Sequence, residues 1–162
     1  MNTQSAASLI TQMDLQPHPE GGYYKEVYRS DNTVLRPSST EPKQACTSIY
    51  YLLEGADYSG FHRLLSDELW YFHKGSPLHI HVIDQDGGYS VHELSDTASG
   101  NFSIVIKAGQ WFASEIPSKI GFVLVSCAVA PGFDFAEFKM AKKEELIAQY
   151  PQYSQIINKL CR

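Results

Sequence analysis

The side chains of this sequence best suited to acid/base chemistry or ligand binding are His62 and Glu68. A turn at Ser66 and Asp67 separates the two short segments that carry them. Because alternate side chains of a strand share one face, both groups are predicted to point into one interior, with Trp70 on its wall. An imidazole titrates just below neutral pH and a carboxyl about two pH units lower. Such an interior could hold a polar ligand or transfer a proton.

This pair has two interpretations. In the first, His62 is a general base and Glu68 is its orienting or acidic partner. Burial would raise the pKa of Glu68 unless a cation pairs with it, and His62 is the expected partner. In the second, the two groups form a buried hydrogen bond that only stabilises the fold. The same alternation turns Leu69 and Tyr71 outward, so we expect a helix or a second subunit to cover that face.

The stretch over residues 17–24 contains two prolines, a glutamate, two glycines and two tyrosines. Glu20 could accept a hydrogen bond from a ligand, and the phenol of Tyr24 could act as a donor or a catalytic acid. The stretch could equally serve only to seal one end of the fold. His18, which lies between the prolines, is predicted to be a packing or surface residue.

A pair of histidines at His79 and His81 has the spacing of two metal ligands on one strand face. Leu78, Ile80 and Val82 form the opposite, apolar face of the same strand. The apolar face is the one expected in the core, so both histidines are predicted to be exposed and without a metal.

The elements that must position these groups are short apolar segments separated by turn residues, which predict antiparallel strands and an all-β fold. The predicted strands cover residues 23–28, 46–53, 59–64, 68–72, 78–83, 89–94, 103–106, 110–113 and 121–128. Helical spacing predicts a helix over 5–14, one over 142–149 and a last one around 156–160, all packed outside the strands. The polar segment 31–43 is predicted to be a mobile loop, a candidate lid at the mouth of the barrel.

Composition fits one globular domain over residues 1–162, since 43% of the residues are hydrophobic and 19% are charged. The net charge of -5 argues against nucleic acid as a partner. Three scattered cysteines, Cys46, Cys127 and Cys161, predict free thiols in a reducing compartment. No apolar run approaches the ~20 residues of a membrane span. We therefore expect a cytoplasmic protein with a small-molecule ligand and no membrane partner.

Gly60, His62, Glu68 and Gly75 resemble the first signature of the cupin superfamily, and Gly109 resembles part of the second. Most of the chain is also similar to one family of cupins whose members mostly have no assigned activity. The motifs that carry this resemblance are Pro17-His18-Pro19-Glu20-Gly21-Gly22-Tyr23-Tyr24, His62-Arg63 with Ser66-Asp67-Glu68 and Trp70, Gly109 with Trp111, and Ala130-Pro131-Gly132-Phe133-Asp134-Phe135.

The resemblance implies a cupin-type double-stranded β-helix, or jelly-roll barrel, that forms a homodimer. It also implies that further side chains of these motifs contribute to ligand binding, beside Glu20 and Trp70. These are Arg63, Ser66, Asp67, Trp111 and Phe135. For Trp111, packing in the core is an equally good interpretation.

In metal-binding cupins the two signatures supply more histidines, but Leu64 and Phe112 stand at two of those positions here. His62 and Glu68 alone make an incomplete ligand set for a divalent metal, so no cofactor is predicted. Three functions stay open. The first is a metal-free epimerase- or isomerase-like enzyme acting on a sugar-like or other small polar metabolite. The others are a non-catalytic ligand-binding or sensing protein and a metal-dependent oxygenase or isomerase.

Overall fold

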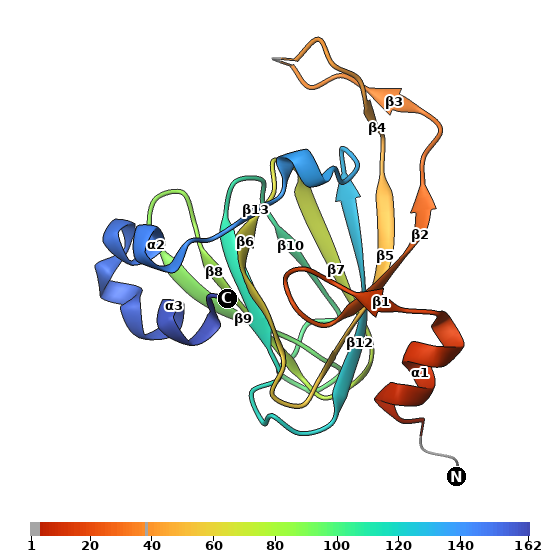
Figure 1. The fold of residues 1–162 in the computed structure, drawn as a ribbon, viewed down its shortest axis with the longest axis vertical. Coiled ribbons are helices and arrows are strands. Elements are labelled where there is room, and N and C mark those ends of the chain that lie inside the picture. Colours follow the sequence, from red (N-terminus) through yellow and green to blue (C-terminus); the bar gives the residue numbers. More distant parts are fainter. Residues whose placement is uncertain (1–3, 38) are drawn as a thin grey trace.

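Two antiparallel sheets face each other (Figure 1). The largest cluster of buried apolar side chains lies between them. The computed structural model describes residues 4–37 and 39–162. In this part of the chain, the first sheet runs, in order across the sheet, through β1 (Gln16–Pro17), β2 (Tyr23–Arg29), β5 (Thr47–Glu54), β12 (Phe122–Ala130), β7 (Asp67–Gly75) and β10 (Ser103–Ile106).

The second sheet runs through β13 (Lys139–Met140), β6 (Tyr58–Arg63), β11 (Trp111–Glu115), β8 (Leu78–Ile83) and β9 (Tyr89–Leu94). All of the named strand pairs in both sheets are antiparallel. The prediction of an all-β fold is confirmed, and the predicted strand bounds agree with the observed ones to within a few residues.

Alternation along β7 decides which side chains reach the interior. Glu68, Trp70 and Phe72 are buried between the sheets, whereas Tyr71 is exposed and Leu69 is half-buried. The alternation agrees with the prediction, whereas Tyr71, expected under a helix or a second subunit, is exposed on the single chain. The outer face of this sheet is partly covered by helix α1 (Ala6–Met13), whose buried side chains pack against apolar residues of β5 and β12.

Helix α1 begins and ends at residues that satisfy its free backbone groups. The Ser5 hydroxyl accepts a hydrogen bond from the Ser8 N–H at 3.1 Å, and Asp14 ends the helix in the left-handed conformation. Ala6 and Leu9 are buried against the sheet. The predicted N-terminal helix is therefore confirmed.

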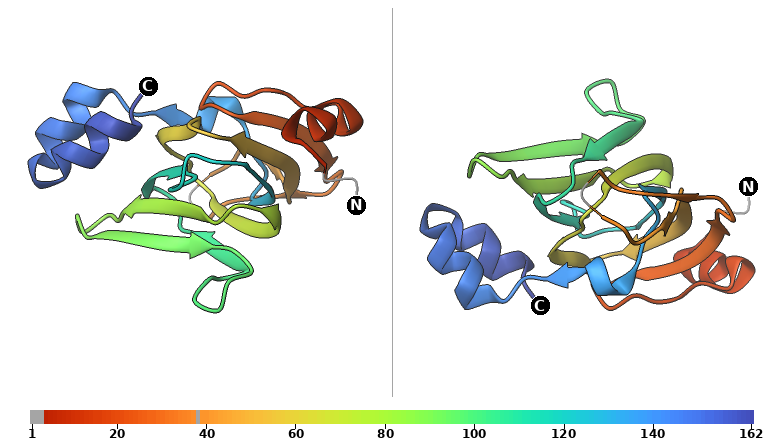
Figure 2. Two further views of the ribbon diagram at one scale, coloured as in Figure 1. Left: turned by 90° about the horizontal axis from the view of Figure 1, so that it is seen from below. Right: turned by 90° about the horizontal axis from the view of Figure 1, so that it is seen from above.

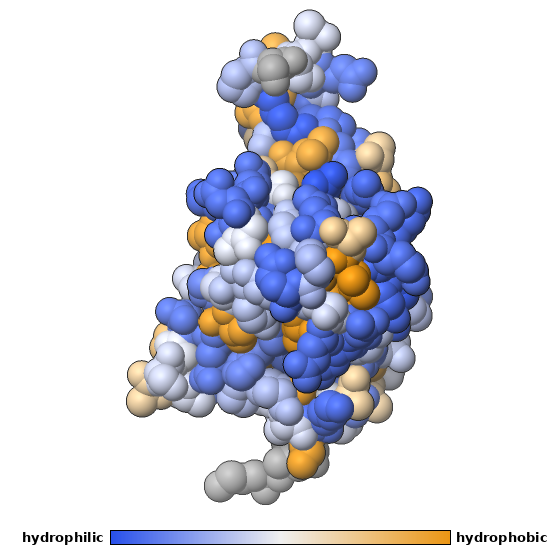
Figure 3. Space-filling view, turned by 90° about the vertical axis from the view of Figure 1, so that its left-hand side faces the viewer, coloured by the Kyte–Doolittle hydropathy of each residue, from blue (hydrophilic) through white to orange (hydrophobic). Residues whose placement is uncertain are grey.

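The C-terminal helices lie on the other side of the barrel from α1 (Figure 2). Helix α2 (Lys143–Gln149), the short 3-10 helix η2 (Pro151–Tyr153) and helix α3 (Ser154–Leu160) follow one another. Their apolar side chains pack on the outer face of the second sheet, against Phe61 and Trp111. The surface on this side is mostly hydrophilic, with apolar residues scattered among the polar ones (Figure 3). None of the helices in the described ranges is long and apolar enough to cross a membrane.

The segment over 31–43, predicted to be a loop, contains strand β3 (Thr33–Val34), which pairs with β4 (Lys43–Gln44) in a hairpin that rises beyond one end of the barrel (Figure 1). Ser38, part of that prediction, lies outside the described residues. Two ion pairs, Arg36–Glu137 at 2.7 Å and Lys43–Asp134 at 2.8 Å, tie the hairpin to the segment after β12. The side chains that line the cavity described below include none from the described part of this segment.

Candidate active site

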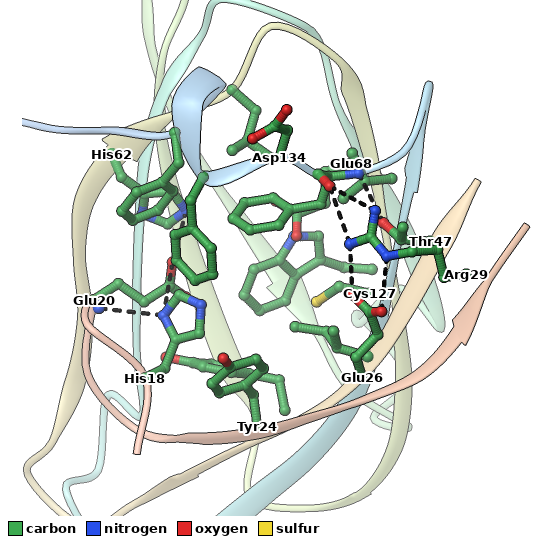
Figure 4. A pocket seen from close by; sticks show the side chains of 18 residues that line it. His18, Glu20, Tyr24, Glu26, Arg29, Thr47, His62, Glu68, Cys127 and Asp134 are labelled. Atoms are coloured by element: carbon green, nitrogen blue, oxygen red, sulfur yellow. Dashed lines mark hydrogen bonds and ion pairs between the residues drawn. The ribbon is translucent and has the colours of Figure 1, made fainter. Parts of the chain in front are cut away.

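A cavity of about 300 Å³ lies between the two sheets, near the end of the barrel from which the hairpin rises (Figure 4). Strands of both sheets line it, together with the loop before β2 and the segment after β12. Its polar and titratable side chains are His18, Glu20, Tyr24, Glu26, Arg29, Thr47, Tyr51, His62, Glu68, Cys127 and Asp134. Its other lining side chains are apolar or aromatic.

Glu20 stands between two histidines on one wall of the cavity. Its Oε2 lies 3.1 Å from Nε2 of His62 and 3.6 Å from Nδ1 of His18, and its Oε1 accepts a hydrogen bond from the Ser59 hydroxyl at 3.0 Å. All four side chains are almost completely buried. The first contact is a hydrogen-bonding distance, so Glu20 and His62 form a buried pair.

The turn that carries Glu20 inward depends on Gly21, whose φ is 113°. A Cβ at Gly21 would meet the Tyr58 carbonyl oxygen at 2.0 Å, so no larger residue fits. The His18 N–H donates to the Gly22 carbonyl at 2.9 Å and closes the turn. This is why a stretch rich in proline and glycine places a glutamate in the barrel instead of on its surface.

The Glu20–His62 pair holds one proton between its facing atoms. The Gly60 carbonyl lies 2.7 Å from Nδ1 of His62 and can only accept, so Nδ1 carries a hydrogen. A neutral His62 therefore presents the lone pair of Nε2 to Glu20, and the contact requires a proton on one partner. Burial lowers the pKa of His62 to about 4, and burial also raises the pKa of Glu20. We therefore treat the two groups as one titrating unit.

Glu68 reaches the cavity from β7, on the sheet opposite His62. Burial, followed by the nearby charge of Glu20, raises the pKa of Glu68 to about 8. Its Oε2 has no hydrogen-bond partner among the described residues. Cys127 lies in the same cavity, and burial keeps the pKa of its thiol well above the usual value. Near pH 7 this wall therefore carries a neutral carboxylic acid and a neutral thiol.

His62 and Glu68 share one cavity, as predicted, but they are not paired with each other. The partner of His62 is Glu20, because the loop before β2 folds back against β6. His18, predicted to be a packing or surface residue, lines the cavity and is buried. The sequence signal that could have placed His18 and Glu20 in the cavity is Gly21-Gly22. These glycines allow a turn that reverses the chain between this loop and strand β2.

Tyr24, predicted to be a catalytic donor, and Trp70 and Phe135, predicted to bind a ligand, all line the cavity. Their roles stay predictions. Phe133 and Phe138, which the sequence analysis did not single out, complete an aromatic rim with Phe135, and the ring centroids of these three residues lie 4.8–6.0 Å apart. Phe135 is 52% exposed and stands at the mouth.

Arg63 lies outside the cavity, which corrects the expectation that it contributes to ligand binding. Trp111 also lies outside the cavity and packs in a buried cluster, which is the second of its two interpretations. Along β6 and β11 it is His62 and Phe112 that face inward, with ring centroids 4.1 Å apart. Their neighbours therefore face outward, where the Arg63 guanidinium lies 4.6 Å from the centre of the Trp111 ring under the C-terminal helices. This contact is a cation–π interaction on the outer face of the sheet.

Ser66 and Asp67 also lie outside the cavity, where each makes contacts that stabilise the start of strand β7. The Ser66 hydroxyl accepts a hydrogen bond from Arg36 at 2.6 Å. Asp67 accepts one from the Ala108 N–H at 2.9 Å and forms an ion pair with Lys107 at 3.0 Å. The motif residues next to Glu68 thus support the strand that presents it.

A second buried histidine–glutamate pair lies outside the barrel, under helix α3. His81 is 6% exposed, and its Nε2 lies 3.4 Å from Oε1 of Glu115. Lys159 of α3 pairs with the same oxygen, and Nδ1 of His81 bonds to the Tyr89 hydroxyl at 2.7 Å. The prediction that this histidine is exposed is wrong, because the helix covers that face of β8. His79 is half-buried.

The donor set around His62 does not fit a divalent metal. A metal needs several donors that converge on one point at ~2.0–2.2 Å. Here Oε2 of Glu20 itself lies between the two histidines. Leu64 in the lining and Phe112, which packs against the His62 ring, add only carbon. Among the described residues, no group of three or more His, Cys, Asp or Glu side chains could hold a metal ion.

Two antiparallel sheets around a cavity lined by histidine, glutamate and aromatic side chains define a jelly-roll barrel of the cupin type. Residues 7–141 match the family Cupin_5, described as cupin superfamily (DUF985). The chain belongs to this family, so the resemblance seen in the sequence is confirmed.

Relatives of known structure share the whole fold. Protein SO0799 from Shewanella oneidensis is 38% identical and has a TM-score of 0.90, with 99% of each chain covered. A hypothetical protein from Leishmania major is 33% identical, with a TM-score of 0.89 and coverage of 98% of this chain and 99% of that one. An uncharacterised protein of Saccharomyces cerevisiae, YML079W, is 29% identical over 87% of this chain and 77% of its own length.

More distant structures share the fold alone. Oxalate decarboxylase from Bacillus subtilis is 16% identical, with a TM-score of 0.57 over 91% of this chain and 37% of that one. This likeness supports the cupin-type barrel and says nothing about the reaction.

Proposed function

We propose that the cavity is the active site of a metal-independent acid/base enzyme that removes a proton from a small polar metabolite and returns one, as isomerases and epimerases do. The observation that carries this proposal is the pair of proton-holding groups on opposite sheets: the Glu20–His62 unit, and Glu68, whose pKa is about 8. Two titratable groups in such different environments are typical of an acid and a base in one site.

The protonation state of each group assigns its role in the proposed reaction. The Glu20–His62 unit is the proton acceptor in the form that has released its shared proton to solvent, because its two facing atoms can then take up one proton. Glu68 is the donor, because it is protonated near neutral pH. Tyr24, which also lines the cavity, is a second candidate donor. The aromatic wall, with Trp70 at its base, suits a ligand with an apolar or ring-shaped face.

The charge of the cavity favours a substrate without a phosphate group. Among the described lining residues Arg29 is the one arginine or lysine, and Glu26 holds its guanidinium at 2.8–2.9 Å. Arg29 also donates to the Phe133 carbonyl at 3.2 Å. The described lining thus leaves no free cation for a diphosphate, and a volume of about 300 Å³ is at the small end of ligand pockets. Small uncharged or singly charged metabolites are the better candidates.

The proposal is tested by incubating the protein in D₂O with a panel of small keto, aldehyde and hydroxy metabolites and following carbon-bound hydrogen by NMR. We expect one class to exchange hydrogen for deuterium, with the exchange lost in Glu20→Gln. A metabolite that raises the melting temperature but never exchanges would instead support the non-catalytic binding protein. Exchange that disappears with a chelator and returns with a metal ion would contradict a metal-independent reaction.

A further inference from the structure

His18 has a defined tautomer. The backbone N–H of Glu20 donates to Nδ1 of His18 at 3.2 Å, so Nδ1 must present a lone pair. The contact from Nδ1 to Oε2 of Glu20 is 3.6 Å, which is too long for a hydrogen bond. The hydrogen of the neutral ring is therefore on Nε2.

The Nε2–H of His18 is free to meet a ligand. It has no hydrogen-bond partner among the described residues, and the His18 side chain is only 6% exposed. In Figure 4 this nitrogen points away from Glu20, toward the middle of the cavity. His18 lines the cavity, so a ligand there can accept this hydrogen bond.

Aromatic neighbours hold the His18 ring in place. Tyr24 meets it edge to face with the ring centroids 4.5 Å apart, Phe138 meets it in the same way at 6.0 Å, and Phe135 stacks on it at 6.3 Å. The donor is thus preorganised, and it lies beside the carboxyl of Glu20 on the same wall.

The surroundings also keep His18 neutral. Burial lowers its pKa, which outweighs the opposing effect of Glu20. A proton on Nδ1 would in addition face the Glu20 N–H, which already points at that nitrogen. A neutral imidazole can polarise a carbonyl group and stabilise the negative oxygen that forms when a neighbouring carbon loses a proton.

We infer that His18 is a further catalytic residue, a neutral donor to the carbonyl oxygen of the substrate, and that the substrates are small carbonyl compounds with a hydrogen on the adjacent carbon. This inference rests on the proposed function and names the substrate class of the same site. Each of the three groups then has a separate role, in which Glu20–His62 accepts the proton, His18 holds the oxygen and Glu68 returns a proton.

The step balances without an oxidant or a metal. The bond from the adjacent carbon to hydrogen breaks, and its proton goes to the Glu20–His62 unit, which has first released its shared proton to solvent. The electron pair forms an enolate whose oxygen accepts a hydrogen bond from His18. Glu68 then protonates the carbon from the other sheet, and the carbonyl re-forms. The proton left on Glu20–His62 exchanges with solvent, and Glu68 takes up a proton again.

The kinetic test compares His18→Phe, which removes the donor, with His18→Gln, whose amide N–H can replace it. For a carbonyl substrate found by deuterium exchange, we expect His18→Phe to lower kcat about 10²- to 10³-fold with KM changed only a few-fold. His18→Gln should recover part of this loss. Equal decreases of kcat in both variants, or a change in KM alone, would overturn the inference. A merely structural role of His18 would not depend on whether the replacement carries an N–H donor.

A second test does not need turnover. Long-range ¹H–¹⁵N spectra should show the Nε2–H tautomer of His18 at pH 7. Dihydroxyacetone at high millimolar concentration should shift this ¹⁵Nε2 signal, whereas glycerol, which lacks the carbonyl, should not. A protonated Nδ1, or the same response to both probes, would contradict a carbonyl-binding donor. If His18 behaves as expected but no metabolite exchanges deuterium, the proposed function fails and the binding role of His18 stands.

Discussion

Two buried histidine–glutamate pairs lie on opposite faces of the same sheet, and only one of them faces a cavity. The Nε2 to carboxylate oxygen distance is 3.1 Å for His62 and Glu20 and 3.4 Å for His81 and Glu115. Burial lowers the pKa of both histidines to about 4. By residue type, distance and burial the two pairs are alike.

Their surroundings differ. The Glu115 carboxylate is balanced by Lys159 of helix α3, and the second nitrogen of His81 bonds to a tyrosine hydroxyl. Within the described ranges Glu20 has no lysine or arginine on its carboxylate, and across the cavity lies another carboxyl, Glu68, with an unpartnered oxygen. The comparison teaches that a buried histidine–glutamate pair is a structural element when its charge is balanced. It becomes a candidate for proton transfer when it borders open space and a second titratable group.

The largest expected effect is the difference in deuterium exchange rate between the Glu20 and Glu115 variants. We expect Glu20→Gln to lower the rate of deuterium exchange about 10³-fold, since general acid/base groups contribute roughly 10²- to 10⁴-fold. Glu115→Gln, its matched control, should leave the exchange rate within about threefold of the unmodified protein. It should instead lower the free energy of unfolding by roughly 1–3 kcal/mol, because Lys159 and His81 lose their partner. Similar losses of activity in both variants would remove the distinction.

Glu68→Gln should act on the pH profile. The exchange rate of the unmodified protein should fall as pH rises through about 8, where Glu68 loses its proton. In Glu68→Gln we expect a rate about 10²-fold lower at pH 7 and no alkaline limb near pH 8. A limb that persists in this variant would assign the donor to another group, with Tyr24 the first candidate.

The stability of the same variant has a definite sign. The pKa of Glu68 is about 8 in the folded chain against the usual 4.5, so the folded state holds a proton that the unfolded state has lost. The stability contributed by this group therefore declines as pH rises from about 4.5 to about 8. Thermal unfolding should show Glu68→Gln gaining melting temperature relative to the unmodified protein over this range. A constant difference at all pH values would contradict the raised pKa.

A smaller effect is expected where the hairpin is tied to the mouth of the cavity. Glu137 accepts both Arg36 at 2.7 Å and Lys43 at 3.1 Å. Glu137→Gln should speed amide hydrogen exchange over residues 33–44 and raise KM by about two- to fivefold, because the aromatic rim loses support. Glu145→Gln, which breaks an exposed pair with Lys142, is the matched control and should change neither quantity. An unchanged KM would separate the hairpin from the site.

The smallest effect should come from removing metal. Because the donors around Glu20 do not converge on one point, we expect exchange activity to survive dialysis against a chelator unchanged. Elemental analysis of protein purified without chelator provides the check. About one transition metal per chain, lost in His62→Ala, would reverse this conclusion.

The sequence predicted what depends on local periodicity. The two-residue repeat along β7 placed Glu68 and Trp70 inside, and helical spacing located α1. Sequence could not predict which carboxyl meets His62, because the contact joins the loop before β2 to β6. It also left Trp111 with two interpretations, ligand binding and core packing. The structure turns Phe112 inward and packs Trp111 under the C-terminal helices.

His81 was missed for a related reason. Its strand shows which face is apolar, and that face does lie in the core. What covers the other face is helix α3, far along the chain, and a single strand carries no signal of it. Contacts between distant segments thus decide both histidine pairs, and those contacts separate the site from its structural counterpart.

The most direct test of this account is the titration of Glu68 itself, followed by ¹³C NMR of the glutamate carboxyl carbons and assigned with Glu68→Gln. We expect Glu68 to be a neutral carboxylic acid at pH 7 that ionises near pH 8. A Glu68 that is already ionised between pH 5 and 6 would leave the cavity without its proton donor and would contradict the acid/base function.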